Sequence, residues 1–371
     1  MQYVDEFRDP KYARLIIERI NQTLEAIPES RKPLQVMEVC GGHTHTIFKF
    51  GIDQLLPDSI EFVHGPGCPV CVLPKSRLDE CIAIAENPQV IFCTFGDAIR
   101  APGSSGSLQD ARARGADVRI VYSPLDALAL AQQNPDREVV FFGLGFETTM
   151  PSTAMTLKQA KLNKIDNFSL FCQHITITPT LQCLLEPGDL RLDGFLMPGH
   201  VSMIIGSEPY QFIANQYGKP SVITGFEPLD ILQALLMLVE QIAEQRCEVE
   251  NQYKRIVQPQ GNQQALIAMQ EVFEAQQRSE WRGLGDIENS GIQLNKEYQA
   301  FDAEVKFCPE KSTAKDPAEC RCGEVLTGRC KPTDCSIFAT SCRPDNAIGA
   351  LMVSSEGACA AYYQYRREEH Q

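Results

Sequence analysis

The stretch "LQVMEVCGGHTH", residues 34–45, introduces the pattern from which we predict the fold. Its first six residues are mostly apolar and favour a β-strand, and the run stops at a cysteine, two glycines and two histidines. Amphipathic helical stretches such as "SRLDECIAIAE" separate it from seven further short β-rich runs. These are "IEFVH" (60–64), "QVIFCTF" (89–95), "VRIVY" (118–122), "EVVFFGLG" (138–145), "FSLFCQH" (168–174), "GFLMP" (194–198) and "SVITGF" (221–226). Near-continuous apolar strands between helices predict parallel sheets that are covered on both faces.

We therefore predict an α/β protein with two Rossmann-like parallel-sheet domains, residues 34–122 and 123–246. A third domain, 247–371, is expected to be mostly helical and cysteine-rich, because 247–305 looks helical and polar. After Cys308 the chain is dense in Cys, Pro and Gly, so it cannot build a normal core and is expected to be held together by a metal group. An N-terminal helix at about 10–27 could pack on either part, so residues 1–33 could belong to the third domain.

The bulk composition limits the possible functions. The 371-residue chain has a formal net charge of −14 and no basic block, which argues against nucleic-acid binding. Its N-terminus has no apolar signal core, and its longest apolar run, "ILQALLMLV", is too short for a membrane span, so we expect a cytoplasmic protein. In that reducing compartment, fifteen cysteines are metal ligands, redox thiols or buried apolar residues rather than a disulfide framework.

The C-terminal cysteines favour an iron–sulfur cluster. None of them forms the paired knuckle typical of zinc sites, and the one close pair is the C-x-C of Cys320 and Cys322. Wide spacing beside apolar residues such as Ile337, Phe338 and Met352 suits a [4Fe–4S] cluster better. Structural zinc and free thiols remain the alternatives. The seven cysteines of this region are Cys308, Cys320, Cys322, Cys330, Cys335, Cys342 and Cys359.

Two further thiol motifs follow the first two strands. "GPGCPVCVLP" (65–74) places Cys68 and Cys71 in a C-x-x-C, a spacing typical of thiol–disulfide exchange, and a helix starting near Pro74 could lower a thiol pKa. In "CGGHTH", Cys40 offers a soft ligand or nucleophile, and His43 and His45 offer imidazoles. With its two glycines we interpret this motif as a flexible, metal-capable arm. The alternatives are an inert buried cysteine pair and hydrogen-bonded structural histidines.

Polar groups also follow two later strands. "GLGFETTMP" places Glu147 at a strand end, with Thr149 as a helix N-cap and Pro151 in the first turn, and "MPGHVS" places His200 on a Pro–Gly turn. Because the carboxyl ends of parallel strands gather ligand sites, we expect Glu147 and His200 to converge on one cleft. Capping alone could explain the threonines. We expect most of the cysteines in apolar patterns to be core residues, namely Cys81, Cys93, Cys172, Cys183 and Cys247.

Taken together, these motifs resemble those of the HypD family, scaffold proteins of [NiFe]-hydrogenase maturation. The matching segments are "CGGHTH" (40–45), "GPGCPVCVLP" (65–74), "GFETT" (145–149) and "PGHVS" (198–202). Cys320, Cys335, Cys342 and Cys359, with 14, 6 and 16 residues between them, have the spacing of the family's cluster ligands. The likeness runs from about residue 34 to the end and implies two α/β domains and one that binds a [4Fe–4S] cluster.

The resemblance also implies a function. HypD proteins take part in assembling the Fe(CN)₂CO moiety of the hydrogenase active site, together with a HypC-type small chaperone and a HypE-type cyanide donor that carries a thiocyanate. Cys40 would hold the iron with a partner's thiolate. Cys68 and Cys71 would be a redox pair, fed by a cluster domain similar to that of ferredoxin:thioredoxin reductase. His43, His45 and His200 would hydrogen-bond ligands or move protons, and Glu147 would orient a neighbour.

Two competing classes remain open. An iron–sulfur-dependent protein disulfide reductase explains the C-x-x-C and the cluster equally well, but not Cys40 with its two histidines. A structural zinc protein explains only the C-terminal region. Cys322 and Cys330 are left without a role; they could form a disulfide beside the cluster or remain thiols.

Overall fold

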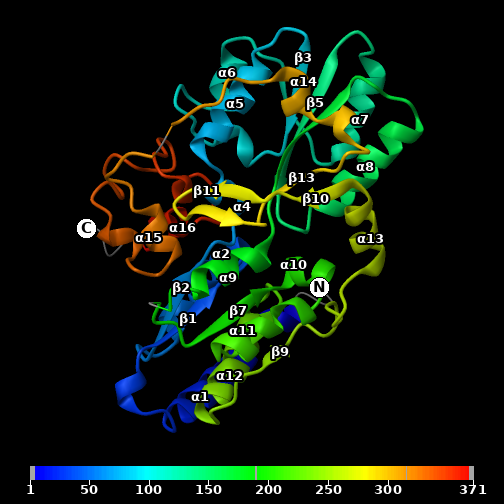
Figure 1. The fold of residues 1–371 in the computed structure, drawn as a ribbon. Coiled ribbons are helices and arrows are strands. Elements are labelled where there is room, and N and C mark those ends of the chain that lie inside the picture. The colour runs from blue at the N-terminus through cyan, green and yellow to red at the C-terminus, as the bar shows by residue number, and fades with distance from the viewer. Residues whose placement is uncertain (1–4, 189, 315, 367–371) are drawn as a thin grey trace.

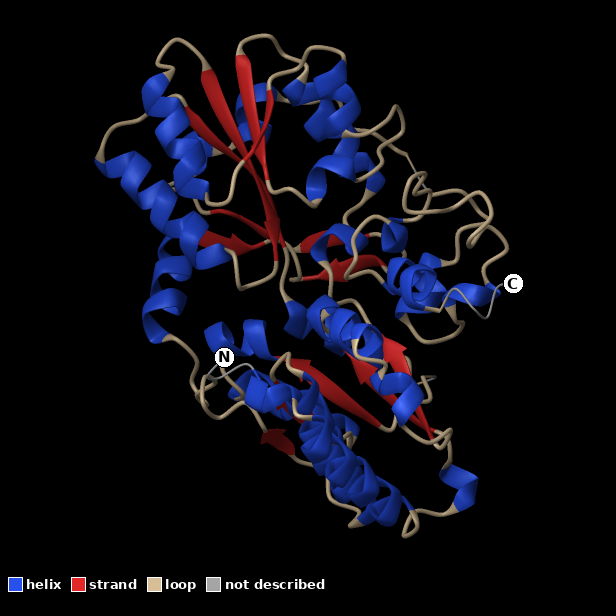
Figure 2. Ribbon diagram, turned by 180° about the vertical axis from the view of Figure 1, so that it is seen from behind, coloured by secondary structure: helices blue, strands red, loops and turns tan. Residues whose placement is uncertain are grey.

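The computed structural model describes residues 5–188, 190–314 and 316–366, and its core is two parallel β-sheets with helices on their faces (Figures 1 and 2). The first sheet has the strand order β2-β1-β7-β8-β9 and the second β4-β3-β5-β6, and every neighbouring pair is parallel. The strands of the first sheet are β1 (Leu34–Glu38), β2 (Ile60–His64), β7 (Gly194–Pro198), β8 (Ser221–Thr224) and β9 (Val249–Asn251). Those of the second are β3 (Val90–Thr94), β4 (Val118–Ile120), β5 (Glu138–Gly145) and β6 (Phe168–His174). The eight predicted strands are thus confirmed.

Sixteen α-helices are present in the described ranges, and none of them is long and apolar enough to cross a bilayer. They are α1 (Pro10–Leu24), α2 (Gly41–Lys49), α3 (Ile52–Leu55), α4 (Pro69–Val72), α5 (Lys75–Ala85), α6 (Leu108–Ala113), α7 (Pro124–Gln133), α8 (Met150–Leu162), α9 (Ile177–Leu185), α10 (Gly199–Ile205), α11 (Gln211–Tyr217), α12 (Pro228–Ala243), α13 (Gln263–Val272), α14 (Ala303–Phe307), α15 (Cys322–Leu326) and α16 (Ala358–Tyr365).

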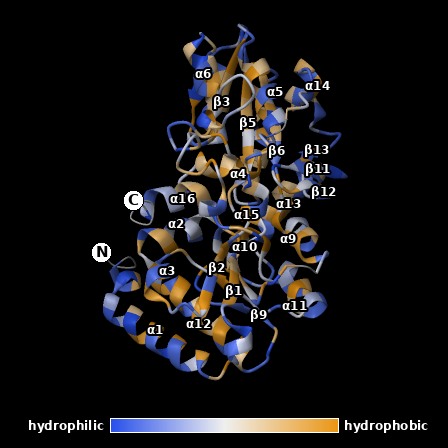
Figure 3. Cartoon of the chain, turned by 90° about the vertical axis from the view of Figure 1, so that its left-hand side faces the viewer, coloured by the Kyte–Doolittle hydropathy of each residue, from blue (hydrophilic) through white to orange (hydrophobic). Residues whose placement is uncertain are grey.

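Buried apolar side chains on both faces of each sheet form the core. In the second sheet, Phe141 joins the cluster under α7 and α8, while its neighbour Phe142 joins the cluster under α5 and α6. Successive side chains of a strand point to opposite faces, so an apolar run fills both layers. In Figure 3 the strands are accordingly coloured mostly as hydrophobic, whereas α1 carries both hydrophobic and hydrophilic residues. In the first sheet, Val36 packs with α1 and α12.

The predicted boundary near residue 122 does not separate the two sheets. The chain builds β1 and β2, leaves to build all of β3–β6, and returns at β7, which pairs directly with β1. Apolar periodicity identifies strands but not their partners, so the sequence order of the strands was a poor guide to their arrangement. The N-terminal helix α1 packs on α12 through Ile20 and Leu24, and therefore lies on the first sheet rather than on the C-terminal region.

The C-terminal third also differs from the mostly helical prediction. β9 completes the first sheet, and two antiparallel pairs follow α13: β10 (Phe273–Ala275) with β13 (Ile292–Leu294), and β11 (Arg278–Trp281) with β12 (Gly285–Glu288). Gly283 and Gly285, both with positive φ, turn β11 into β12. Beyond Cys308, the described residues form short helices and turns that enclose several cysteines.

Candidate functional site

A cleft of about 300 Å³ lies where the carboxyl ends of strands from both sheets meet. All four glycine-containing motifs contribute to its walls, and the C-terminal region contributes Glu356. The loops converge as expected, and His200 lines the cleft together with Cys40, but Glu147, which was expected beside His200, does not line it. The lining residues are Cys40, Gly42, Gly67, Pro69, Val70, Phe95, Asp97, Ala98, Leu144, Gly145, Phe146, Thr148, Thr149, His200, Val201 and Glu356.

Cys40 lies at the N-cap of α2, directly after β1. Close contacts fix its main chain, because a Cβ atom on Gly67 would lie only 2.3 Å from the Cys40 N and Cα atoms. Burial raises the pKa of the Cys40 thiol, and the nearby carboxylates of Glu38 and Glu356 raise it further. Cys40 is thus a half-buried thiol that must lose its proton to bind a metal.

The CGGHTH segment is not an arm: Cys40 is the N-cap of α2, and residues 41–45 form its first turns. Its glycines serve close packing: a Cβ on Gly41 would lie 2.5 Å from the Glu356 Cβ, and one on Gly42 would lie 2.8 Å from the ring of Phe226. The interpretation as an arm failed because glycine pairs permit close approach as readily as flexibility.

Two of the predicted histidines flank the ring of Phe226. His200 stacks on it at a centroid distance of 3.7 Å, and His43 lies 5.0 Å away on a tilted ring. His43 is fully buried, and burial lowers its pKa to about 4. Within the described chain neither of its ring nitrogens has a hydrogen-bond partner of normal geometry. Two neutral imidazoles thus lie against one aromatic ring beside Cys40, since burial also lowers the pKa of His200.

His45 does not join this group. It is two residues beyond His43 on a helix, so it points to another side, where its ring meets the edge of Tyr365 on α16. It does not line the cleft. The structure therefore gives no support to the expectation that His45 acts next to Cys40.

Glu147 lies beneath the cleft rather than in its wall. Its Oε1 atom accepts the Ile177 N–H at 3.1 Å, while its Oε2 atom has no partner in the described chain. Burial raises its pKa to about 7. Thr149 takes the predicted N-cap position of α8, although its hydroxyl bonds the Phe146 carbonyl and lies 3.3 Å from His174 Nδ1 instead of capping the helix.

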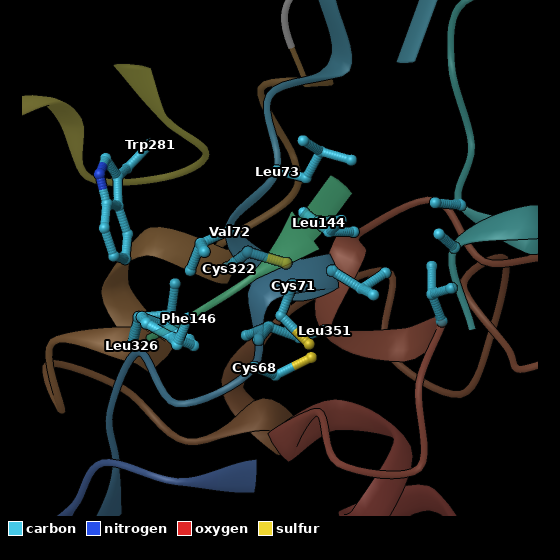
Figure 4. Close-up of a cluster of buried hydrophobic side chains, with 14 of the residues drawn as sticks. Cys68, Cys71, Val72, Leu73, Leu144, Phe146, Trp281, Cys322, Leu326 and Leu351 are labelled. Carbon is cyan, nitrogen blue, oxygen red and sulfur yellow. The ribbon is translucent and has the colours of Figure 1, made fainter. Parts of the chain in front are cut away.

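Cys68 and Cys71 are buried side by side at the start of α4, and both thiols are free. Figure 4 shows them with Cys322 in one apolar cluster. Burial raises the pKa of Cys71, and the neighbouring Cys68 and Cys322 add to the effect. The predicted lowering of a thiol pKa by the following helix is thus wrong for Cys71, because desolvation outweighs the helix dipole.

Five C-terminal cysteines line an enclosed, mostly apolar pocket next to this pair: Cys320, Cys322, Cys335, Cys342 and Cys359. Ile337, Phe338 and Met352 complete its walls. Gly349 closes one side: its N–H donates to Cys342 Sγ at 3.5 Å, and a Cβ there would lie 2.7 Å from the sulfur atoms of Cys320 and Cys322. Cys330 lies outside this pocket, in a different one beside β2.

The pocket has the type of donor that a [4Fe–4S] cluster takes, namely cysteine sulfurs behind apolar walls. Within the described ranges, no three His, Cys, Asp or Glu side chains are placed to hold one ion. In a [4Fe–4S] cluster four thiolates each bind a different iron, and burial and N–H donors to sulfur tune its potential. The pocket supplies sulfur, shielding and the Gly349 N–H.

Sequence reasoning missed five site residues: Glu38, His64, Asp97, Phe226 and Glu356. Glu38 carried a usable signal, since a charged residue within an otherwise apolar strand needs a buried partner. Phe226 belongs to a repeated "GFE" that follows strands at 145–147 and 225–227. Of the other cysteines, Cys81, Cys93 and Cys172 are core residues as predicted, while Cys183 is half-buried and Cys247 exposed.

The fold thus combines two parallel sheets with a cysteine–histidine cleft, a buried thiol pair and a pocket lined by cysteines. The chain belongs to the HypD family. The family model described as "Hydrogenase formation hypA family" matches residues 11–366. The chain is 59% identical to hydrogenase maturation factor HypD of Escherichia coli over 370 residues, covering all of this chain and 99% of that protein. It is 54% identical to the HypD of Rhodobacter capsulatus, covering 98% of each, and 47% identical to that of Cupriavidus necator, covering 99% of this chain and 98% of that protein.

Proposed function

We propose that this chain acts in hydrogenase maturation as the scaffold on which the Fe(CN)₂CO unit of a [NiFe]-hydrogenase is assembled. The observation that carries the proposal is the meeting of Cys40 and His200 in one cleft, backed by a buried thiol pair. The iron unit is cargo, and Cys40 is its anchor. A thiolate suits this soft, electron-rich iron, and the open side of the cleft admits a second thiolate from a HypC-type partner.

Cyanide would arrive as a thiocyanate on a HypE-type partner. Its release follows R–S–C≡N + 2e⁻ + H⁺ → R–SH + CN⁻, in which the S–C bond breaks, the sulfur is reduced and cyanide passes to iron. Oxidation of the Cys68–Cys71 dithiol to a disulfide supplies two electrons and two protons, so one proton is left over. The free state and close contact of these thiols support this role.

Cys320, Cys335, Cys342 and Cys359 are the proposed ligands of a [4Fe–4S] cluster. When bound, the cluster would supply electrons one at a time, and two of them, together with two protons, would return the Cys68–Cys71 disulfide to the dithiol. Cys322 fits between the two sites, because it lies 3.2 Å from Cys320 Sγ and raises the pKa of Cys71. The same arrangement keeps the disulfide reductase as the second candidate.

The neutral imidazole of His200, which lines the cleft, would exchange hydrogen bonds and protons with ligands there. His43 does not line the cleft; this buried, neutral imidazole would act indirectly, by packing against the ring of Phe226 on which His200 stacks. Glu147 does not line the cleft, so it would orient its neighbour Ile177, whose main-chain N–H it accepts.

Infrared spectroscopy of the anaerobically purified protein, co-expressed with its HypC-type partner, tests the scaffold function. We expect stretching bands of iron-bound cyanide and carbonyl in the wild type and none in Cys40→Ala. Cys247→Ala is the matched control, since this exposed thiol lies far from the cleft and should leave the bands unchanged.

Bands of equal strength in Cys40→Ala would exclude Cys40 as the anchor. No bands in the wild type, together with turnover of a disulfide substrate, would favour the reductase. Iron and acid-labile sulfide measured on the same samples separate a cluster from structural zinc.

A further inference from the structure

A buried carboxylate, Glu38, lies directly behind Cys40. It is fully inaccessible to solvent, yet both of its oxygens are engaged. Its Oε2 atom accepts the Cys40 N–H at 3.0 Å, and its Oε1 atom accepts the Thr44 hydroxyl in a short hydrogen bond. Oε1 also lies 2.7 Å from His64 Nδ1. Carboxylates are buried only when such partners replace the lost water.

Glu38 fixes the start of α2 from the end of β1. Cys40, at the N-cap of α2, makes no side-chain cap hydrogen bond of normal geometry. The Glu38 carboxylate accepts the main-chain N–H of Cys40 itself and the hydroxyl of Thr44, at the helix end where negative charge is favoured. Neither hydrogen bond uses the Cys40 thiol.

His64 fixes the carboxylate in turn. Glu38 and His64 are paired across β1 and β2, at the ends of the two strands. The His64 ring is held by Phe48 of α2 at 5.1 Å and by Tyr362 of α16 at 6.0 Å. Tyr362 follows Cys359 by less than one turn of α16, so the pair also contacts the helix that carries a proposed cluster ligand.

We propose that Glu38 and His64 are positioning residues for the metal anchor: they fix the Cys40 main chain and place a negative charge behind the iron-binding thiol. This inference rests on the proposed scaffold function. The charge lies in a site sheltered from water, where electrostatic effects are weakly screened. It increases the electron density on iron bound to Cys40, and therefore the back-donation into the carbonyl and cyanide ligands.

The infrared bands of the loaded protein report this electron density. Glu38→Gln keeps the shape and can still accept the Cys40 N–H, so we expect loading to persist with the carbonyl band at higher wavenumber than in the wild type. Glu38→Ala removes the acceptor as well, and we expect the bands to be lost or strongly weakened. Loading that persists in Glu38→Gln but is lost in Glu38→Ala would separate the positional role of Glu38 from the effect of its charge.

Two further variants make the test specific. Thr44→Val conserves volume and removes a hydroxyl donor that withdraws charge from Oε1 of Glu38, so the carbonyl band of this variant should shift to lower wavenumber. Thr44→Val also tests the effect of the Glu38 charge if Glu38→Gln does not fold. Glu61→Gln is the control, because Glu61 lies on the same sheet but pairs with Lys331 and not with α2.

The outcomes distinguish this inference from the proposed function. If the wild type shows the bands, unshifted bands in both Glu38→Gln and Thr44→Val would overturn the role of Glu38. A shift of equal size in the control Glu61→Gln would overturn it as well. Absence of bands in the wild type would overturn the scaffold function and this inference with it. Opposite shifts in the two test variants, with none in the control, would establish the role.

Discussion

Glu147→Gln should make the folded protein more stable at high pH. The Glu147 carboxyl is buried, and burial raises its pKa from 4.5 to about 7. The folded state therefore binds a proton more tightly than the unfolded chain does. This stabilising contribution is complete below about pH 4.5 and is lost as the pH rises through 7, because the buried group must then ionise.

The magnitude follows from the pKa difference. Each unit corresponds to 1.36 kcal/mol, so a rise from 4.5 to about 7 lowers the free energy of unfolding above pH 8 by about 3 kcal/mol, relative to acidic pH. Glutamine is neutral at every pH and can still accept the Ile177 N–H. Its amide group has no partner in place of Oε2, which lowers stability equally at all pH values.

The assay is equilibrium urea unfolding of both proteins at several values between pH 5 and 8.5. All other titrating groups are shared, so the difference between the two unfolding free energies isolates Glu147. We expect this difference to move in favour of the variant by about 2–3 kcal/mol across the range. Parallel pH profiles would refute the reasoning, because they would mean that Glu147 ionises in the folded protein as readily as in the unfolded chain.

Three other changes test the site. His174 is buried and its pKa is lowered to about 4, so stability should fall as the pH drops from 6.5 towards 4, and His174→Gln should remove about 3 kcal/mol of that acid sensitivity in urea unfolding. Gly67→Ala should destabilise the protein by about 1–3 kcal/mol and abolish iron–cyanide loading, because the new methyl group would lie 2.3 Å from the Cys40 main chain. The control Gly96→Ala should have neither effect, because the atom nearest to its new methyl group would be 3.8 Å away. Cys335→Ser should lose the visible absorption of the proposed cluster, whereas a serine at the exposed Cys308 should retain it.

The sequence predicted the strands well because their chemistry is local. "EVVFFGLG" is apolar on both sides, and β5 covers the same residues, 138–145. Strand pairing is not local: nothing in "GFLMP" indicates that β7 lies beside β1 rather than beside β6. The turn at Gly283 and Gly285 was missed because the surrounding polar residues resemble a helix surface as much as a pair of exposed strands.

The site was predictable where a motif carried both a reactive group and its position. Cys40 and His200 follow strands that end at the same edge, and they meet in the cleft. The place of His45 outside the cleft could not be predicted from the motif alone, because it depends on helix periodicity, which turns His45 away from His43. Glu356 could not be placed, since its approach to Gly41 depends on how the C-terminal region folds back over the first sheet.

The interrupted first sheet has a consequence for synthesis. A ribosome delivers β1 and β2 early, but β7, the other neighbour of β1, begins only at residue 194, after every strand of the second sheet has been made. The second sheet, contiguous between 90 and 174, can therefore close first, while the strand that leads into Cys40 waits with one edge uncovered. The cysteine pocket is completed last, by Cys359. The order of translation thus makes the C-terminal cysteine pocket the final part to form.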